Sequence, residues 1–530
     1  MREQLPLPLS LQQLTPTILV TVTISLLLVA IYLVRQRQWR SKYRFPPSPP
    51  GWRPFTGHSH LMPKEFHGDK AKEWAEQLGS EMMHLSLGGV DWVFLNSSRV
   101  VEDLLEKRSS IYSSRPAFVM VGEIISRMKR LVLQPYGTEW KNLRRVMHIL
   151  LTGSSADSYR PLEDLESKQA MWEILHRPEE WHLSTIRFAA SFTIAMIYGV
   201  RQKGHSELFQ KVSDAQDEFL RNNVPGTWLV DDYPQLQKLP RSLQWWRPYG
   251  DKLFEFTRDA FKGYYDLMVE NIKKGVQKDC FATKFYAETE SKKGGDFDFD
   301  QKLFTTGGLI EAGSDTTKNQ LNMLVAAMAA DPNTWIKKAR AELDSVCGAN
   351  AERLPTFDDW DMLPYIQAIM KESMRWRPNV NPTGFPHALI RDDEYEGYRF
   401  PAGTVVTINN WAISLNPEEY ENPTKFDPDR FLNEDIWNAT KGHYGYGAGR
   451  RTCAGFKVAQ NSMFIFFSRF IYCFDVFEDP NDRIDTYHIP LTPPPGKAND
   501  PPFTAKVRVR SEAHKQLILS SCAEALEAYD

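Results

Sequence analysis

The chain has 530 residues, of which 42% are hydrophobic and 25% are charged, a balance that excludes a disordered or collagen-like protein. Its net charge of −3 argues against a nucleic-acid partner, because a protein that neutralises phosphates carries a basic excess on its binding face. Its five cysteines are too few and too widely spaced for a disulfide framework, and a reducing compartment fits them best.

The N-terminal region predicts a membrane anchor. From Thr15 to Val34 twenty consecutive residues carry no charge and are dominated by Leu, Ile and Val, which is about the length that a helix needs to cross the hydrocarbon layer. A cleaved secretory signal is the alternative, but its apolar run would be shorter and would follow a basic region. Five basic residues follow the run by position 44, so we expect residues 1–44 to span the membrane once, with the later residues facing the cytosol.

The segment after the anchor predicts a stiff spacer. Residues 45–57 contain five prolines, which lack an amide donor and restrict the residue before them, so a helix cannot continue there. We therefore divide the chain into the anchor (1–44), a proline-rich hinge (45–57) and one catalytic domain (58–530), because no repeat and no second boundary stands out.

The remaining pattern predicts a mainly α fold with small β-sheets. Apolar residues recur at helical spacing over 70–78, 138–151, 165–175, 253–276, 302–330, 334–346, 363–375 and 454–474. Short β-rich runs bounded by turn residues lie at 83–87, 91–95, 399–409 and 503–509. The polar composition of residues 291–300 predicts an exposed loop before a long helix.

The most informative segment surrounds Cys453. Residues 444–455 contain four glycines and two adjacent arginines. Glycines let a backbone approach a flat ligand closely, while the arginines and the start of the following helix should lower the pKa of the thiol. A phosphate-binding loop and an ordinary buried cysteine are the alternatives, but the spacing fits neither GxGxxG nor GxxxxGK[ST].

This loop resembles the haem-binding signature of the cytochrome P450 family, Phe-x-x-Gly-x-Arg-x-Cys-x-Gly. The five positions are occupied by Tyr446, Gly449, Arg451, Cys453 and Gly455. Tyr446 departs from the usual phenylalanine but keeps the aromatic ring. The resemblance implies a cytochrome P450 fold that holds heme b (iron protoporphyrin IX), with Cys453 as the axial thiolate ligand of the iron.

A polar notch interrupts the long apolar helix at residues 312–317 and resembles the family's oxygen-activating segment. The resemblance implies that Gly313 leaves room for dioxygen and that Asp315 and Thr316 are catalytic residues that relay protons. The alternative is that the hydroxyl groups merely bond to carbonyls one turn earlier.

Haem propionates need cations and donors nearby. Trp140 and Arg144 lie one helical turn apart and resemble the family's Trp-x-x-x-Arg propionate contact, and Arg451 would add a third group. His387 stands where the family commonly supplies another donor, although a structural histidine is an equal alternative. The family's buried charge triad would be formed by Glu372, Arg375 and Arg430.

The resemblance implies a fungal-type monooxygenase at the endoplasmic reticulum membrane. No phosphate-binding loop for flavin or nicotinamide is evident, so electrons would come from an NADPH-dependent cytochrome P450 reductase, and O2 would oxidise a lipophilic or aromatic small molecule in fungal secondary metabolite biosynthesis. By family analogy the pocket involves residues 111–133, 219–246, 309–315, 379–385 and 489–495. A membrane-anchored haem-binding sensor and a peroxide-rearranging member of the same family are the alternatives; intact Asp315 and Thr316 disfavour the latter.

Overall fold

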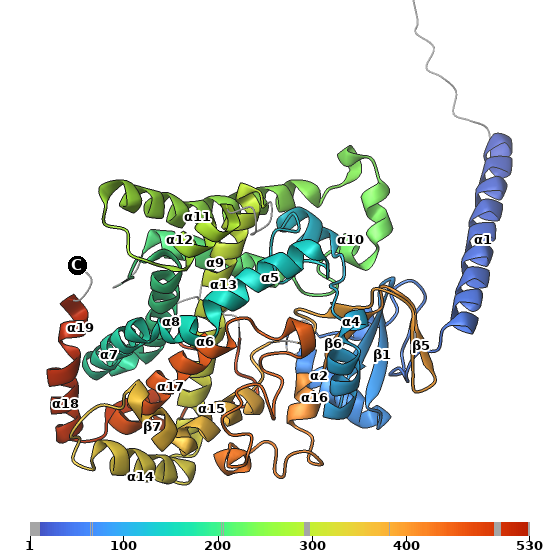
Figure 1. Ribbon diagram of the computed structural model, residues 1–530. Helices are drawn as coiled ribbons and strands as arrows, with labels where there is room; N and C mark the ends of the chain where they lie inside the picture. Colours follow the sequence, from blue (N-terminus) through green and yellow to red (C-terminus); the bar gives the residue numbers. More distant parts are fainter. Residues whose placement is uncertain are drawn as a thin grey trace, which may run out of the picture.

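A computed structural model describes residues 11–527 except 64, 66, 203, 205, 291–296, 381 and 492–499. Helices predominate and the strands are short, as predicted (Figure 1). The helices are α1 (Leu11–Lys42), α2 (His67–Leu78), α3 (Ser98–Val101), α4 (Ser109–Tyr112), α5 (Thr138–Leu151), α6 (Gly153–Asp157), α7 (Arg160–His176), α8 (Trp181–Tyr198), α9 (Glu207–Asn222), α10 (Leu229–Asp232), α11 (Arg247–Lys274), α12 (Phe281–Glu290), α13 (Phe299–Ala330), α14 (Trp335–Cys347), α15 (Pro364–Trp376), α16 (Asn410–Ser414), α17 (Phe456–Cys473), α18 (Glu512–Cys522) and α19 (Glu524–Glu527). The strands are β1 (Met82–Leu87), β2 (Val90–Leu95), β3 (His387–Ala388), β4 (Asp393–Tyr395), β5 (Tyr398–Phe400), β6 (Val405–Ile408), β7 (Phe474–Glu478) and β8 (Ala505–Val509).

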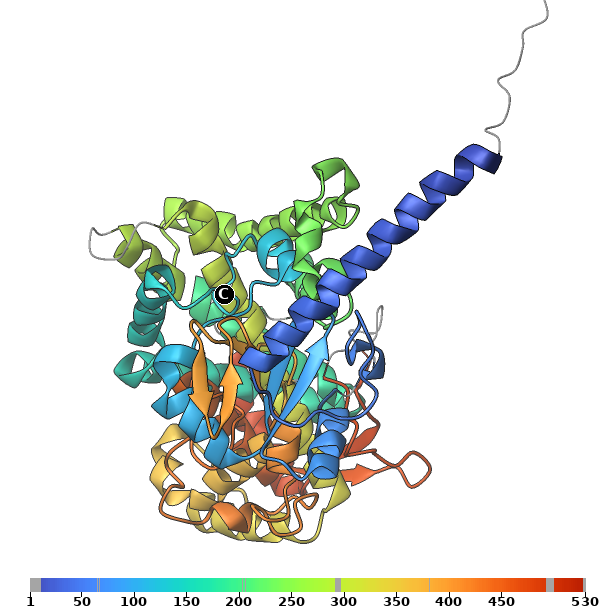
Figure 2. The ribbon, with the colours of Figure 1, turned by 90° about the vertical axis from the view of Figure 1, so that its right-hand side faces the viewer.

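Helix α1 stands apart from the body in Figure 1, whereas in Figure 2 its lower half crosses in front of the body and its upper half projects beyond it. It covers residues 11–42 of the predicted anchor (1–44), whose first ten residues lie outside the described part of the chain. Among the described residues, however, no helix combines the length and the apolar character that crossing a membrane requires. The predicted membrane-spanning helix therefore has no support in the described part of the chain.

The proline-rich segment lies against the body. The Pro47 carbonyl accepts a hydrogen bond from the His84 amide at 2.9 Å, and the ring of Phe45 stacks on the His84 side chain with centroids 4.4 Å apart. The first half of the expected hinge is thus held on β1. The division at residues 44 and 57 itself stays a prediction.

A four-stranded sheet in the order β1-β2-β6-β3 forms one side of the molecule. Strands β1 and β2 are antiparallel, β6 runs parallel to β2 with Trp92 opposite Val405, and β3 pairs antiparallel with β6. All four residues of β6 are buried, as expected for a strand with neighbours on both sides and a covered face. Because His387 begins β3, this sheet fixes its position.

Helix α13 runs through the middle of the helical body (Figure 1). Its first half packs with Phe254 and Phe261 of α11, and its second half packs with the aromatic residues of α17. Helix α8 lies so close that a Cβ on Gly313 would be 2.9 Å from Thr193. The predicted polar notch is therefore held between the two largest hydrophobic clusters, close to the helix that follows Cys453.

Candidate active site

The Cys453 loop is a series of tight turns. The Gly447 amide donates to the Tyr444 carbonyl at 2.9 Å, and the Cys453 amide donates to the Tyr446 carbonyl at 2.8 Å. Gly449 has a φ of +60°, and a Cβ there would lie 1.9 Å from the Leu105 carbonyl oxygen. Glycine is required at this position because a side chain would be both strained and obstructed. The loop thus presents Cys453 just before α17.

Cys453 is exposed, whereas Cys280, Cys347, Cys473 and Cys522 are buried. Burial nevertheless raises the pKa of the Cys453 thiol, while the Gly455 amide and the Arg144 charge oppose the rise. A thiol that is accessible and still surrounded by protein lines an internal space rather than the outer surface. The predicted lowering of the pKa was wrong for the metal-free thiol, because desolvation outweighs the two opposing groups. Coordination to a metal would itself remove the proton.

The notch of α13 also faces an internal space. Ala312 and Thr316 are exposed although they lie mid-way along a helix whose neighbouring residues are largely buried. The Thr316 hydroxyl donates to the Ala312 carbonyl at 2.7 Å. This is the hydrogen bond to a carbonyl one turn earlier that the alternative interpretation predicts. Asp315 accepts from Lys318 at 2.5 Å. Gly313 instead faces Thr193 of α8, so its proximity to that helix, rather than room for dioxygen, explains the glycine.

Three arginines gather beside the cysteine loop. Arg144 donates to the Thr452 carbonyl, Arg451 donates to the Ser113 and Gln134 carbonyls at 2.7 and 2.8 Å, and Arg115 donates to the Val132 carbonyl at 2.9 Å. Among the described residues these acceptors are backbone carbonyls and none is a carboxylate. Burial, together with the charges of Arg115 and Arg144, lowers the pKa of Arg451 to about 8. Such a cluster suits an anionic ligand.

Trp140 and His387 lie at the same cluster. The Arg451 guanidinium covers the Trp140 ring at 4.1 Å. His387 is buried, and its Nδ1 donates to the Tyr112 carbonyl at 2.8 Å. Burial, and secondly the Arg115 charge, lowers the pKa of His387 to about 3, so the ring is neutral with Nε2 as its second polar atom. The five predicted site residues Trp140, Arg144, His387, Arg451 and Cys453 thus come together from separate segments of the chain.

Comparison with known proteins decides the family. Residues 46–499 match the sequence model of the family described as Cytochrome P450. The chain belongs to the cytochrome P450 family. It is 33% identical over 512 residues to the cytochrome P450 monooxygenase verL of Clonostachys rogersoniana, covering 94% of this chain and 92% of the relative. It is 32% identical over 494 residues to the cytochrome P450 monooxygenase aneD of Aspergillus aculeatus, covering 92% of each chain.

A solved structure shares the P450 fold. A zebra fish cytochrome P450 with abiraterone aligns with a TM-score of 0.65 and 21% identity, covering 84% of this chain and 100% of that one. Family and fold together make this protein a monooxygenase of the haem-thiolate type, with heme b and an axial cysteine. The residues described above fit that group, because one accessible cysteine lies next to a cluster of cations that has no carboxylate among its acceptors.

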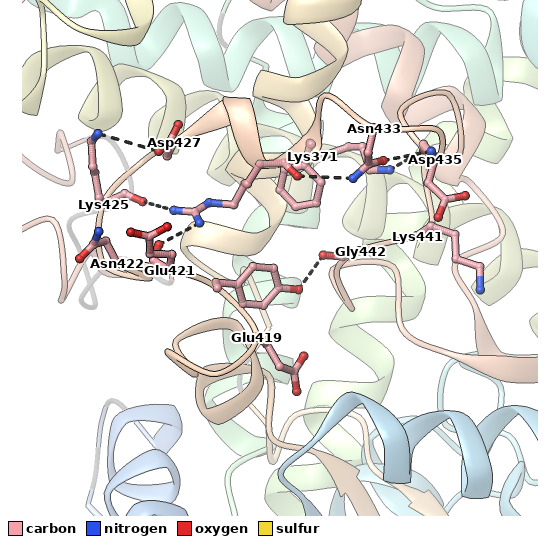
Figure 3. Close-up of a pocket in the computed structure, with 13 residues that line it drawn as sticks. Lys371, Glu419, Glu421, Asn422, Lys425, Asp427, Asn433, Asp435, Lys441 and Gly442 are labelled. Atoms are coloured by element: carbon pink, nitrogen blue, oxygen red, sulfur yellow. Dashed lines mark hydrogen bonds and ion pairs between the residues drawn. The ribbon is translucent and has the colours of Figure 1, made fainter.

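The charge triad typical of P450 proteins is formed as predicted. Arg375 binds Glu372 through two hydrogen bonds of 2.6 and 2.7 Å, and Arg430 approaches the same carboxylate at 3.4 Å. A polar hollow of about 630 Å³ opens beside the triad (Figure 3). Its lining residues belong to α15 and to the segment 419–442, and none comes from the cysteine loop or from α13. This hollow is therefore separate from the candidate active site.

Arg115 is the functional candidate that the sequence analysis missed. Besides Val132, its guanidinium donates to the Phe385 carbonyl and, at 2.8 Å, to the Pro386 carbonyl, so it ties the segment before β3 to the arginine cluster. The available signal was weak: an arginine flanked by Ser114 and Pro116 inside one of the segments assigned to the pocket.

Proposed function

We propose that this P450 uses O2 and electrons from an NADPH-dependent cytochrome P450 reductase to oxidise a lipophilic or aromatic small molecule. The observation that carries the proposal is one accessible cysteine beside three arginines, just before a helix that packs against α13, the helix that carries the exposed Ala312 and Thr316. When bound, haem supplies the activation of dioxygen and the one-electron chemistry. The protein supplies binding, orientation and protons.

Each predicted residue has a proposed part in this arrangement. Cys453 would hold the haem iron through its sulfur, positioned by the loop and by the Gly455 amide just before α17. Trp140, Arg144, His387 and Arg451, joined by Arg115, would bind the two propionates, whose negative charge would relieve the repulsion among the cations.

The proposed proton path runs along α13. The Thr316 hydroxyl lies on the exposed face of the helix, and Asp315 next to it is pinned by Lys318. Because an ion-paired carboxylate is a poor proton carrier, Lys318 must release Asp315 before this carboxylate can pass protons to the Thr316 side. Both residues would then act as proton donors in the internal space that the exposed residues of α13 face.

We further propose a place in fungal secondary metabolite biosynthesis, with hydroxylation, desaturation or oxidative coupling as the outcome. The proposal is supported by the identity of about one third with P450 monooxygenases such as verL. The apolar and aromatic character of residues 219–246 and of Phe385 favours a bulky, lipophilic substrate.

We also propose that the enzyme works at the endoplasmic reticulum membrane with the catalytic domain in the cytosol. In support, α1 exposes aliphatic side chains such as Leu19 and Leu26, and Leu229, Leu243 and Trp245 are exposed in and near α10. Figure 1 places α10 on the same side of the body as α1. Membrane fractionation of the full chain and of a chain lacking residues 11–42 tests this: only the full chain should sediment with microsomes.

The decisive experiment for the activity combines the haem-loaded protein, the reductase and NADPH. Oxygen consumption that rises with a lipophilic candidate substrate, and a product one oxygen heavier or two hydrogens lighter by mass spectrometry, would support the proposal. A haem sensor would consume no NADPH, and a peroxide-rearranging enzyme would convert a hydroperoxide without reductase or O2.

A further inference from the structure

A buried ion pair stands in the wall of the region assigned to substrate binding. Arg130 and Glu311 are 3% and 5% exposed, and Nη1 of Arg130 donates to Oε2 of Glu311. Glu311 is the residue just before the exposed Ala312 on α13. The guanidinium lies 4.0 Å from the ring of Phe219, which in turn stacks near Phe385 at 6.4 Å.

This pair is where four separately predicted pocket segments meet. Arg130 comes from residues 111–133, Phe219 from 219–246, Glu311 from 309–315 and Phe385 from 379–385. Two more aromatic rings, those of Phe261 and Phe304, lie 5.7 and 5.9 Å from the guanidinium. A polar pair surrounded by aromatic side chains is the kind of convergent polar group that orients a ligand in an apolar pocket.

The pair has unused hydrogen-bonding capacity. Nε and Nη2 of Arg130 and Oε1 of Glu311 are buried and have no hydrogen-bond partner among the described residues. Nε and Nη2 form the forked edge of a guanidinium, whose two N–H groups point in parallel. Buried donors without acceptors are unfavourable, so each such group calls for a partner.

We infer that this edge of Arg130 and Oε1 of Glu311 together recognise a neutral substrate group in which a carbonyl oxygen lies beside an N–H hydrogen, as in a lactam. The carbonyl would accept from the fork and the N–H would donate to Glu311. A charged group is disfavoured, because the two side chains already neutralise each other and a third charge would be buried without a partner. The inference rests on the proposed monooxygenase function and specifies its substrate.

We expect ligand entry to involve the Phe219 ring. It lies 4.0 Å from the guanidinium, so a lactam bound to Arg130 would contact it and we expect it to shift. Phe219 lies near the end of α9, whose Gln216 donates to the Glu311 carbonyl at 3.1 Å. This hydrogen bond ties α9 to α13, so we expect the ring to change rotamer while the helix stays in place.

The test uses three tricyclic probes of the same shape: phenanthridinone, which is a lactam, its N-methyl derivative and phenanthrene. Binding to the haem-loaded full chain is measured by isothermal titration calorimetry. We expect phenanthridinone to bind more than about tenfold more tightly than phenanthrene, as charge-assisted hydrogen bonds imply. The N-methyl compound should fall between them because it has lost the donor for Glu311.

Variants locate the effect. Arg130→Lys keeps the charge opposite Glu311 but lacks the fork, so it should abolish most of the preference for the lactam over phenanthrene. The double variant Arg130→Met with Glu311→Met removes the whole pair without leaving a buried charge, and should bind all three probes alike. Arg187→Lys is the control, since Arg187 is also paired with a buried glutamate, Glu166 in α7, but lies outside the segments assigned to the pocket.

Several results would overturn the inference: equal affinity of wild-type protein for lactam and hydrocarbon, binding of neither at its solubility limit, a preference that survives in the double variant, or tighter binding of phenanthrene carboxylate than of the lactam. The carbon monoxide spectrum of each preparation separates this failure from that of the proposed function. A normal haem-thiolate spectrum without lactam preference refutes only the recognition by Arg130 and Glu311.

Discussion

Replacing Arg375 by methionine should destabilise the fold more than any surface change. Glu372 and Arg375 are both 0% exposed. Besides its two bonds to Glu372, Arg375 donates to the carbonyls of Ser414 and Pro423 at 2.6 and 2.8 Å. Its loss leaves a buried carboxylate without its main partner, which costs about 3–5 kcal/mol. That is a large share of the roughly 5–15 kcal/mol by which a folded protein is stable.

Guanidinium-induced unfolding followed by tryptophan fluorescence measures the effect. Arg430→Gln is the control: Arg430 meets Glu372 only at 3.4 Å, so we expect a loss of about 1 kcal/mol. Adding Glu372→Gln to Arg375→Met should restore part of the stability, because no buried charge then lacks a partner. The reasoning is refuted if Arg430→Gln costs as much as Arg375→Met, or if the double variant is the least stable of the three.

Three further outcomes are expected. Gly449→Ala should abolish haem incorporation, measured as haem per protein, because a Cβ would lie 1.9 Å from the Leu105 carbonyl oxygen. Gly447→Ala, with a similar positive φ but a Cβ no closer than 3.8 Å to the Arg451 carbonyl oxygen, should cost only about 1 kcal/mol and keep the haem. Burial lowers the pKa of His443 to about 3, so below a pH of about 6.5 the unfolded chain binds a proton at this histidine and the folded protein does not. This difference should lower the free energy of unfolding by about 2 kcal/mol on going to about pH 5. His443→Phe should remove that part of the pH dependence of unfolding. Thr316→Val should leave the carbon monoxide spectrum intact and lower product formed per NADPH by roughly 10²-fold; unchanged coupling would exclude Thr316 from proton delivery.

Periodicity found many of the amphipathic elements but missed α9, in which the buried residues Val212, Ala215 and Phe219 recur at helical spacing. All eight predicted helices are present with ends shifted by a few residues. Helix α8 was missed because nearly all of its residues are buried, and a helix that is apolar all round has no periodic face to detect. The strand predicted over 399–409 is two strands: β5 ends at Phe400, a turn through Pro401 and Gly403 follows, and β6 joins a different sheet.

The site could be predicted only where its residues lie within one motif. The cysteine loop and the α13 notch are contiguous, so their spacing is visible in the sequence. Arg115 acts through carbonyls that are 17, 270 and 271 residues away, and no local pattern reveals such contacts. Burial determines the direction in which the pKa of Cys453 shifts. The sequence shows the neighbouring arginines but not the burial.

The most direct measurement is the absorption spectrum of the haem-loaded protein after reduction and exposure to carbon monoxide. If the Cys453 sulfur binds the iron, wild-type protein has the long-wavelength Soret band typical of thiolate ligation, and Cys453→Ser loses it while a buried-cysteine control, Cys473→Ser, keeps it. Absence of the band in wild-type protein, or its persistence in Cys453→Ser, would contradict the proposed centre.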